Sequence, residues 1–207
     1  AAEKKFLNLI KNNSENNNLI LALADVYRIE KKYQDAIIFY SKIISKVNNN
    51  YENLWKILYL RGICYERINK WSFAEKDFLN SLNINPDSSQ VLNYLAYSWL
   101  ERDIKIDIAL DMLEKAYKSN PKDFYILDSL GWAYYKINKF DEAANLMEQV
   151  IVMAPSEVIS LDHLGDIYFS LKRKREAIYF WQQALDLANP DEKIVEEIKE
   201  KLQEYYE

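Results

Sequence analysis

Residues 124–155 read FYILDSLGWAYYKINKFDEAANLMEQVIVMAP, and the pattern within this stretch indicates two helices joined by a short turn. In the first half, Leu127, Leu130 and Tyr134 follow the i, i+3, i+7 spacing that places side chains on one face of a helix. The second half has acidic residues in its first turn, where the helix dipole favours them, and a second apolar stripe at Ala143, Met147 and Val150. Pro155 closes the unit, because proline cannot continue a helix.

The rarest residues of the chain show that this unit repeats with a period near 34 residues. The glycines are Gly62, Gly131 and Gly165, and the prolines are Pro86, Pro121, Pro155 and Pro190. Alanines recur at fixed phase at Ala36, Ala74, Ala109, Ala143 and Ala177. Small residues at fixed phase indicate places where two helices approach closely. So few glycines and prolines also favour a helical chain over a sheet protein, which needs many tight turns.

These residues resemble the tetratricopeptide repeat, a 34-residue helix–turn–helix unit with the signature W-x2-L-G-x2-Y…A-x3-F…A-x4-P. The sequence departs from it at Arg61, which replaces the usual Leu before glycine, and at Pro190, which comes one residue late. The resemblance implies an all-α fold, an α-solenoid wound as a right-handed superhelix. It covers five units, the third with an extra residue in its turn and the first without the final proline: 17–50, 55–88, 89–123, 124–157 and 158–190.

The two ends of the chain read as an incomplete repeat and a cap. A step of 34 residues back from the second-helix positions of the first unit reaches Ala2, Phe6 and Leu9. Residues 1–16 therefore predict the second helix of a truncated repeat, and we expect the chain to be a piece of a longer solenoid. Residues 191–207 predict an amphipathic helix, which is typical of the cap at the end of a repeat array. Together the units predict one continuous domain of about five and a half repeats plus a C-terminal capping helix.

Composition and charge exclude several function classes. The 207 residues carry 27 Lys and Arg against 32 Asp and Glu, and a net charge of −5 is a poor footprint for binding nucleic acid. No run of 18 apolar residues is present, so the sequence predicts no transmembrane segment. One cysteine and one histidine cannot build a paired-His or multi-Cys metal site, and we expect neither a metal nor a cofactor.

The sequence offers little for catalysis, and we expect no enzyme activity. Cys64 and His163 fall in repeats three units apart, and helix layers stack at about 8–10 Å, so the two cannot form a nucleophile–base pair. Cys64 is expected to be a packed hydrophobe, and His163 either a contact in the binding groove or a surface residue. The basic run at 172–175 falls in an inter-helix turn and is expected to be solvated.

The resemblance also implies where a binding surface lies. In tetratricopeptide repeat proteins the first helices line a concave groove, and positions 2, 5, 9 and 12 of each repeat point into it. Aromatic rings there would bury large areas at low entropic cost, and carboxylates would pair with Lys or Arg. The alternative is that the aromatic rings only pack against neighbouring repeats. The candidate peptide-binding residues are Tyr59, Tyr97, Tyr125, Asp128, Trp132, Tyr135, Asp162, Asp166 and Phe169.

One known ligand type can be tested against the sequence. Chaperone-binding tetratricopeptide repeat domains hold a C-terminal carboxylate with a clamp of Lys, Asn and Arg at fixed positions. The corresponding positions here hold Leu21, Asp25, Leu60, Gln90 and Tyr94, and no other frame reproduces the clamp. The expected partner is therefore not a chaperone tail but a protein or peptide segment with apolar and some basic residues. The sequence leaves the partner's identity and the oligomeric state open.

The function predicted from these features is that of a non-enzymatic scaffold or adaptor that binds a peptide or protein segment in the concave groove. An alternative is the regulatory or substrate-docking arm of a larger enzyme. Residues 93–99, 128–132 and 162–166 resemble bacterial tetratricopeptide repeat proteins of the cell envelope, some of which are outer-membrane lipoproteins acting as adaptors. That resemblance implies a periplasmic or outer-membrane-associated location, while a cytoplasmic one stays open because a lone packed thiol suits either compartment.

Overall fold

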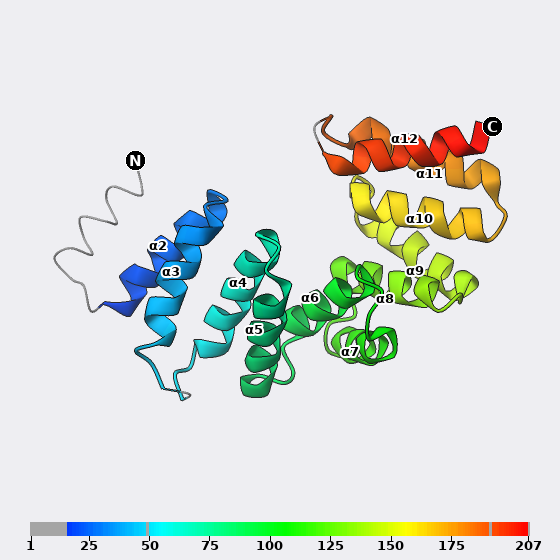
Figure 1. Cartoon of the computed structure of the whole chain (residues 1–207). Helices are drawn as coiled ribbons and strands as arrows, with labels where there is room; N and C mark the ends of the chain where they lie inside the picture. The colour runs from blue at the N-terminus through cyan, green and yellow to red at the C-terminus, as the bar shows by residue number, and fades with distance from the viewer. Residues whose placement is uncertain (1–15, 49, 191, 207) are drawn as a thin grey trace. The chain divides into compact units, whose positions relative to one another are not determined.

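The computed structural model describes residues 16–48, 50–190 and 192–206, and within them every regular element is a helix (Figure 1). This confirms the predicted all-α fold. In the described residues, no helix combines the length and the apolar character needed to cross a bilayer. The helices are α2 Asn17–Ile29, α3 Tyr33–Ile44, α4 Leu54–Arg67, α5 Trp71–Ile84, α6 Ser89–Leu100, α7 Ile106–Ser119, α8 Phe124–Lys136, α9 Phe140–Met153, α10 Val158–Ser170, α11 Lys174–Leu187 and α12 Lys193–Tyr206.

The chain divides into two compact units, and the boundary lies between Val91 and Leu92 inside α6. The first unit contains α2 to α5, and the second contains most of α6 and all of α7 to α12. Each unit has a buried apolar core of its own. The single continuous domain expected from the sequence stays a prediction. So does the truncated repeat at 1–16, because residues 1–15 lie outside the described part of the chain.

The helices pack as hairpins that follow the predicted repeats. α2 packs on α3, α4 on α5, α8 on α9, and α10 on α11. Successive hairpins contact one another through α3 and α4 in the first unit and through α9 and α10 in the second. The pair α8–α9 falls within 124–157, and the pair α10–α11 falls within 158–190. The pair α4–α5 begins at Leu54, one residue before the predicted unit 55–88, and the repeat boundaries stay a prediction.

The turn inside each hairpin depends on a residue with a positive φ angle. In four hairpins the turn has three residues, and the middle one is left-handed, which lets the next N–H reach back to the last turn of the helix. The N–H of Lys139, for example, donates to the carbonyl of Tyr134 at 2.9 Å. The third hairpin has a five-residue turn, 101–105, which is two residues longer than the others, whereas one extra residue was expected there. The four middle residues are Lys31, Asn69, Asn138 and Lys172.

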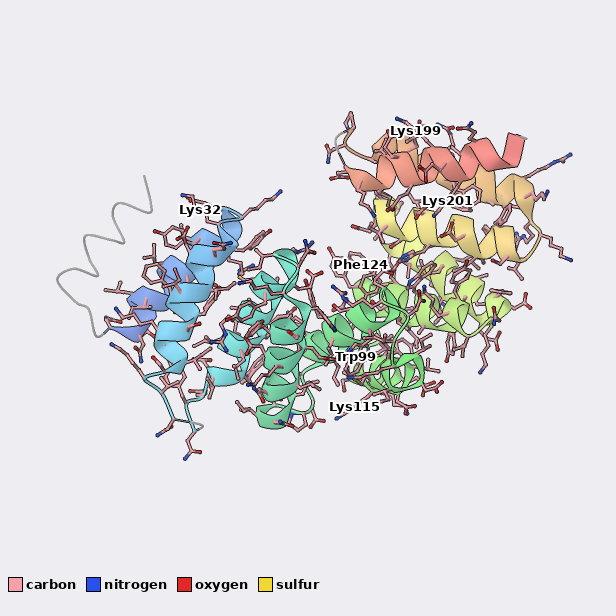
Figure 2. All side chains as sticks on the ribbon, viewed as in Figure 1. Lys32, Trp99, Lys115, Phe124, Lys199 and Lys201 are labelled. Carbon is pink, nitrogen blue, oxygen red and sulfur yellow. The ribbon has the colours of Figure 1, made fainter. Side chains whose placement is uncertain are left out.

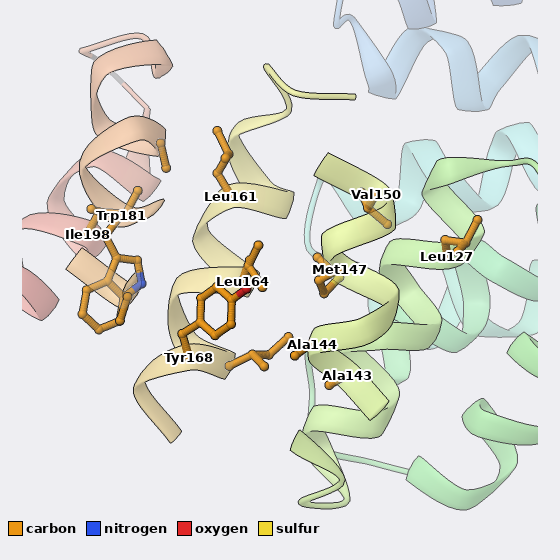
Figure 3. Packing of buried hydrophobic residues seen from close by; sticks show 13 residues of the cluster. Leu127, Ala143, Ala144, Met147, Val150, Leu161, Leu164, Tyr168, Trp181 and Ile198 are labelled. Atoms are coloured by element: carbon orange, nitrogen blue, oxygen red, sulfur yellow. The ribbon is translucent and has the colours of Figure 1, made fainter. Parts of the chain in front are cut away.

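Two of the repeated glycines in the second unit lie where the helices of a hairpin touch. A Cβ atom on Gly165 would lie 2.4 Å from the indole ring of Trp181, and one on Gly131 would lie 2.8 Å from Sδ of Met147. Both distances are shorter than van der Waals contact allows, so the absence of a side chain permits this packing. Figure 3 shows Met147 and Trp181 among the buried apolar side chains of this unit.

The last helix covers the end of the second unit. α12 packs on α11, and Ile198 is fully buried. Ile194 and Leu202 lie on the same stripe of α12 and pack against the buried cluster that contains Trp181. This arrangement confirms the capping helix predicted for residues 191–207. The side chain of Tyr205, which continues the stripe in the sequence, lies outside the described residues.

Candidate functional site

Three successive first helices of the second unit, α6, α8 and α10, bring aromatic side chains together. The imidazole of His163 stacks on the indole of Trp132, with ring centroids 4.0 Å apart and planes 12° apart. The ring of Tyr97, on α6, has its centroid 6.2 Å from that of His163. The ring of Tyr135, on α8, stacks on Trp132 with centroids 4.6 Å apart. We call these four residues, Tyr97, Trp132, Tyr135 and His163, the aromatic cluster.

Polar bonds tie the aromatic cluster together between repeats. The indole N–H of Trp132 donates to Oε1 of Glu101 at 3.0 Å, which joins α8 to the turn that follows α6. Nδ1 of His163 lies 3.3 Å from Oδ1 and 3.2 Å from Oδ2 of Asp128, which joins α10 to α8. Trp132 is 8% exposed and His163 is 5% exposed. Most of the surface of both rings is therefore already used by contacts within the chain.

The charges around His163 favour its protonated form. Burial by itself lowers the pKa of His163, because a charged imidazolium loses its hydration. The carboxylate of Asp128, with smaller contributions from Asp162 and Asp166, outweighs this and raises the pKa above its ordinary value. Burial, followed by the carboxylates of Glu101 and Asp128, also raises the pKa of Tyr97. Neighbouring carboxylates therefore favour a positive charge on the imidazole of His163.

Two further carboxylates on α10 hold a lysine from the last helix. Nζ of Lys201 lies 2.8 Å from Oδ1 and 2.9 Å from Oδ2 of Asp162. The same nitrogen lies 2.8 Å from Oδ1 and 2.9 Å from Oδ2 of Asp166. Figure 2 shows Lys201 on the side of α12 that faces α10, with Lys199 on the opposite side. We call Asp162 and Asp166 the acidic pair.

The acidic pair depends on this cation electrostatically. Burial and the adjacent charge of Asp166 raise the pKa of Asp162, although Lys201 opposes them. Burial lowers the pKa of Lys201, but the charges of the acidic pair outweigh this and raise it above its ordinary value. Without a cation, two carboxylates in a partly desolvated site would repel each other, so the site favours an ammonium group.

Other predicted binding residues are more exposed. Phe169 on α10 is 46% exposed and lies next to Trp181, with ring centroids 5.6 Å apart. Tyr125 on α8 is 58% exposed and packs against Phe124 at 4.0 Å. These two rings therefore have free area for an external ligand.

Comparison with known proteins identifies the family. The tetratricopeptide repeat profile matches residues 129–192, which contain α9, α10, α11 and most of α8. Residues 129–192 therefore carry the tetratricopeptide repeat. The TPR repeat-containing protein PA4667 of Pseudomonas aeruginosa is 36% identical over 83 residues, which make up 40% of this chain. They are 14% of PA4667, so the match spans a small part of that relative's length.

Solved structures share the same fold. A tetratricopeptide repeat protein from Parabacteroides merdae superposes with a TM-score of 0.78 at 19% identity, covering 99% of this chain and 79% of that one. YrrB, described as a TPR protein with an unusual peptide-binding site, gives a TM-score of 0.65 at 18% identity, covering 94% and 97%. Identities this low establish the fold alone. Tetratricopeptide repeats commonly mediate protein–protein interactions and are generally not catalytic.

The structure groups most of the predicted binding residues in the second unit. His163 contacts Tyr97, Asp128 and Trp132, and Tyr135 stacks on Trp132. Lys201 joins Asp162 and Asp166. Tyr59 lies in the first unit on α4, where its ring is 6.1 Å from that of Phe78. Burial raises the pKa of Tyr59 to about 12. Binding by each of the nine residues stays a prediction.

Three residues that organise this region are not at the groove positions 2, 5, 9 and 12 of a repeat. His163 is at the sixth position of its repeat, next to a groove position. Its side chain is buried, so the prediction of a surface residue is wrong. Glu101 lies in the longer turn of the third repeat, and Lys201 lies in the capping helix. The only signal in the sequence for Lys201 is its position beside Leu202 at the edge of the apolar stripe.

Two other sequence expectations concern residues outside this region. Cys64 is buried, and burial raises the pKa of its thiol to about 12, which confirms a packed thiol. The basic run 172–175 is exposed, as expected, but only its first two residues lie in the turn, because α11 begins at Lys174. Within it, the guanidinium of Arg173 lies 4.1 Å from the ring centroid of Tyr168 and donates to Glu176 at 3.0 Å.

Proposed function

We propose that this chain is a non-enzymatic interaction scaffold that binds a protein segment on the first-helix surface of its second unit. This surface is formed by the outward groups of α6, α8 and α10. The observation that carries the proposal is the meeting of Tyr97, Trp132 and His163 from three successive first helices. These contacts hold the three helices together before a ligand binds, which lowers the entropic cost of binding.

The chemistry of this surface favours an apolar segment that carries basic residues. Phe169 and Tyr125 offer exposed rings, and aromatic residues dominate the energetics of binding sites. Phe169 and Asp166 share the neighbour Trp181, so a carboxylate of the acidic pair lies near an exposed ring. The ion pair of Lys201 supports this choice, because it is an example of a lysine seated on the same surface.

An adaptor role in the bacterial cell envelope, with a periplasmic or outer-membrane-associated location, is part of this proposal. Its support is the resemblance of residues 93–99, 128–132 and 162–166 to envelope proteins of this family. The match to PA4667 covers only 83 residues, so any role that a full-length relative has is also only proposed for this chain.

A display experiment tests the binding surface. Random 12-residue peptides displayed on phage are panned on the full chain, and enriched peptides are titrated by calorimetry against Phe169→Ala and Tyr125→Ala. Each variant is expected to weaken binding at least about tenfold, or about 1.4 kcal/mol. Tyr179→Ala is the matched control, because Tyr179 is 56% exposed but lies on the second helix α11.

The same titrations can also contradict the proposal. Enriched peptides should contain apolar residues together with Lys or Arg. If both variants bind at wild-type affinity while alanine substitutions at residues 172–175 abolish binding, the peptides bind the outer turn and the proposed surface is wrong.

A further inference from the structure

The contact between Lys201 and the acidic pair has the features of a binding subsite rather than of a surface ion pair. Asp162 is 8% exposed, and the side chain of Lys201 is 28% exposed. All four carboxylate oxygens of the pair lie within 2.9 Å of one nitrogen. Exposed ion pairs seldom reach this coordination, because water competes for the same oxygens.

The walls of this subsite are fixed by neighbouring helices. The indole N–H of Trp181 on α11 donates to Oδ1 of Asp166 at 3.0 Å, which orients that carboxylate. The Trp181 ring lies 5.8 Å from Nζ of Lys201 and adds a cation–π contact. Trp181 itself is held by its close packing against Gly165. Both carboxylates therefore come from α10, and α11 orients that of Asp166.

The shape of the acceptor set favours lysine over arginine. An ammonium is a compact charge with three donors, which suits oxygens that converge on one point. A guanidinium is a planar fork that matches one carboxylate side by side. Ile198 and Leu202, at i−3 and i+1 from Lys201, belong to the apolar stripe of α12, and the lysine lies at the edge of this stripe.

We propose that Asp162, Asp166 and Trp181 form a lysine subsite for an amphipathic helix, and that α12 is its occupant within the chain, which a partner helix displaces. This inference deepens the proposed function and rests on it. A tethered helix acts at an effective concentration in the millimolar range, so a free helix competes only when it binds more tightly or when α12 is released. The cap thereby sets a threshold for partner binding.

The test uses the full chain and a fluorescently labelled peptide of residues 192–207 as the probe, read by fluorescence anisotropy. In Lys201→Glu the acidic pair repels its own α12, so the subsite opens. We expect this variant to bind the peptide at least tenfold more tightly than the wild-type chain does. The matched control is Lys199→Glu, because Lys199 is exposed on α12 and pairs with Glu196.

Peptide variants test the lysine itself. The peptide with Lys201→Gln should bind the opened chain at least tenfold more weakly, while the peptide with Lys199→Gln should bind like the unmodified one. A Lys201→Arg peptide should also bind more weakly. Circular dichroism confirms folding of each protein, and Lys201→Gln in the chain replaces Lys201→Glu if the charge reversal prevents folding.

Two results would overturn the inference. The first is equal binding of the peptide by the wild-type chain, the opened variant and the Lys199→Glu control. The second is equal binding of the peptides with and without Lys201. The display experiment tests Phe169 and Tyr125 instead. Its peptides can therefore still bind when the tests of the lysine subsite are negative. Loss of the Phe169 and Tyr125 effects, with the lysine effects intact, would instead reject the wider surface.

Discussion

The imidazole of His163 stacks on the indole of Trp132, and the two residues belong to the first helices of successive repeats. Each ring has a polar partner on another element, since Trp132 donates to Glu101 and His163 contacts Asp128. Repeat proteins derive their stability from contacts between neighbours. This stack is therefore a contact between repeats that joins α8 to α10.

The stability of this contact should depend on pH through His163. The folded pKa of His163 lies above its ordinary value of 6.5, so its protonation stabilises the fold fully below that pH. The contribution is lost as the pH rises through the folded pKa. In urea denaturation of the wild-type chain, the urea concentration at the unfolding midpoint should decrease as the pH is raised from 6 to 9. His163→Gln and Asp128→Asn should both reduce that fall, and an unchanged slope in His163→Gln would reject this role.

The packing at the two glycines of the second unit predicts unequal costs for the same substitution. Gly165→Ala places a methyl group 2.4 Å from the rigid indole of Trp181 and should cost about 1–3 kcal/mol through overpacking. Gly131→Ala meets the flexible end of Met147, and the higher helix propensity of alanine, about 1 kcal/mol, offsets much of the strain. Denaturant unfolding of both variants measures the difference. Equal stabilities would show that Trp181 can move aside.

The departure from the family pattern at Arg61 predicts strong non-additivity. Arg61 donates to both oxygens of Asp77 at 2.7 Å and to Ser41 at 2.9 Å, and Asp77 is almost fully buried. Arg61→Leu restores the family residue but leaves a buried charge, and should cost about 3 kcal/mol of stability. Arg61→Leu combined with Asp77→Leu should lie within about 1 kcal/mol of wild type. A double variant as unstable as the sum of the single variants would contradict this account.

The left-handed turn residues predict a stabilising substitution. Lys172 has a φ of 61°, is exposed, and lies in the middle of the turn between α10 and α11. Glycine adopts this conformation without the steric cost that a Cβ atom adds, so Lys172→Gly should stabilise the chain by about 0.5–1 kcal/mol. Gln182→Gly, at an exposed position in the interior of α11, should instead destabilise it by a similar amount. Thermal denaturation of the two variants checks the opposite signs.

The sequence predicted the fold well because its signals are local and repeated. Glycine, proline and alanine at a fixed period mark the close contacts and ends of each hairpin, as Gly165 and Trp181 illustrate. The same period placed Asp128 and Trp132 on the first helix facing other first helices. It could not show how exposed they are, because that depends on residues of other repeats, such as Glu101 and His163.

The acidic pair illustrates the other limit of sequence reasoning. The repeat frame selected Asp162 and Asp166 as ligand contacts from their positions alone. It did not reveal that Lys201 already contacts them, because α12 reads as a charged outer helix and its docking is a tertiary contact. The position of a binding residue follows from a repeat pattern, whereas its occupancy depends on what the rest of the chain places against it.

Chemical-shift mapping tests the central claim, binding on the first-helix surface, most directly. The uniformly ¹⁵N-labelled full chain is titrated with a display-selected peptide while its backbone amide resonances are followed. The account predicts that the largest shifts fall in α8 and α10, with Phe169 and Asp166 among them. Shifts concentrated in the second helices α9 and α11, or in the turn at 172–175, would contradict it.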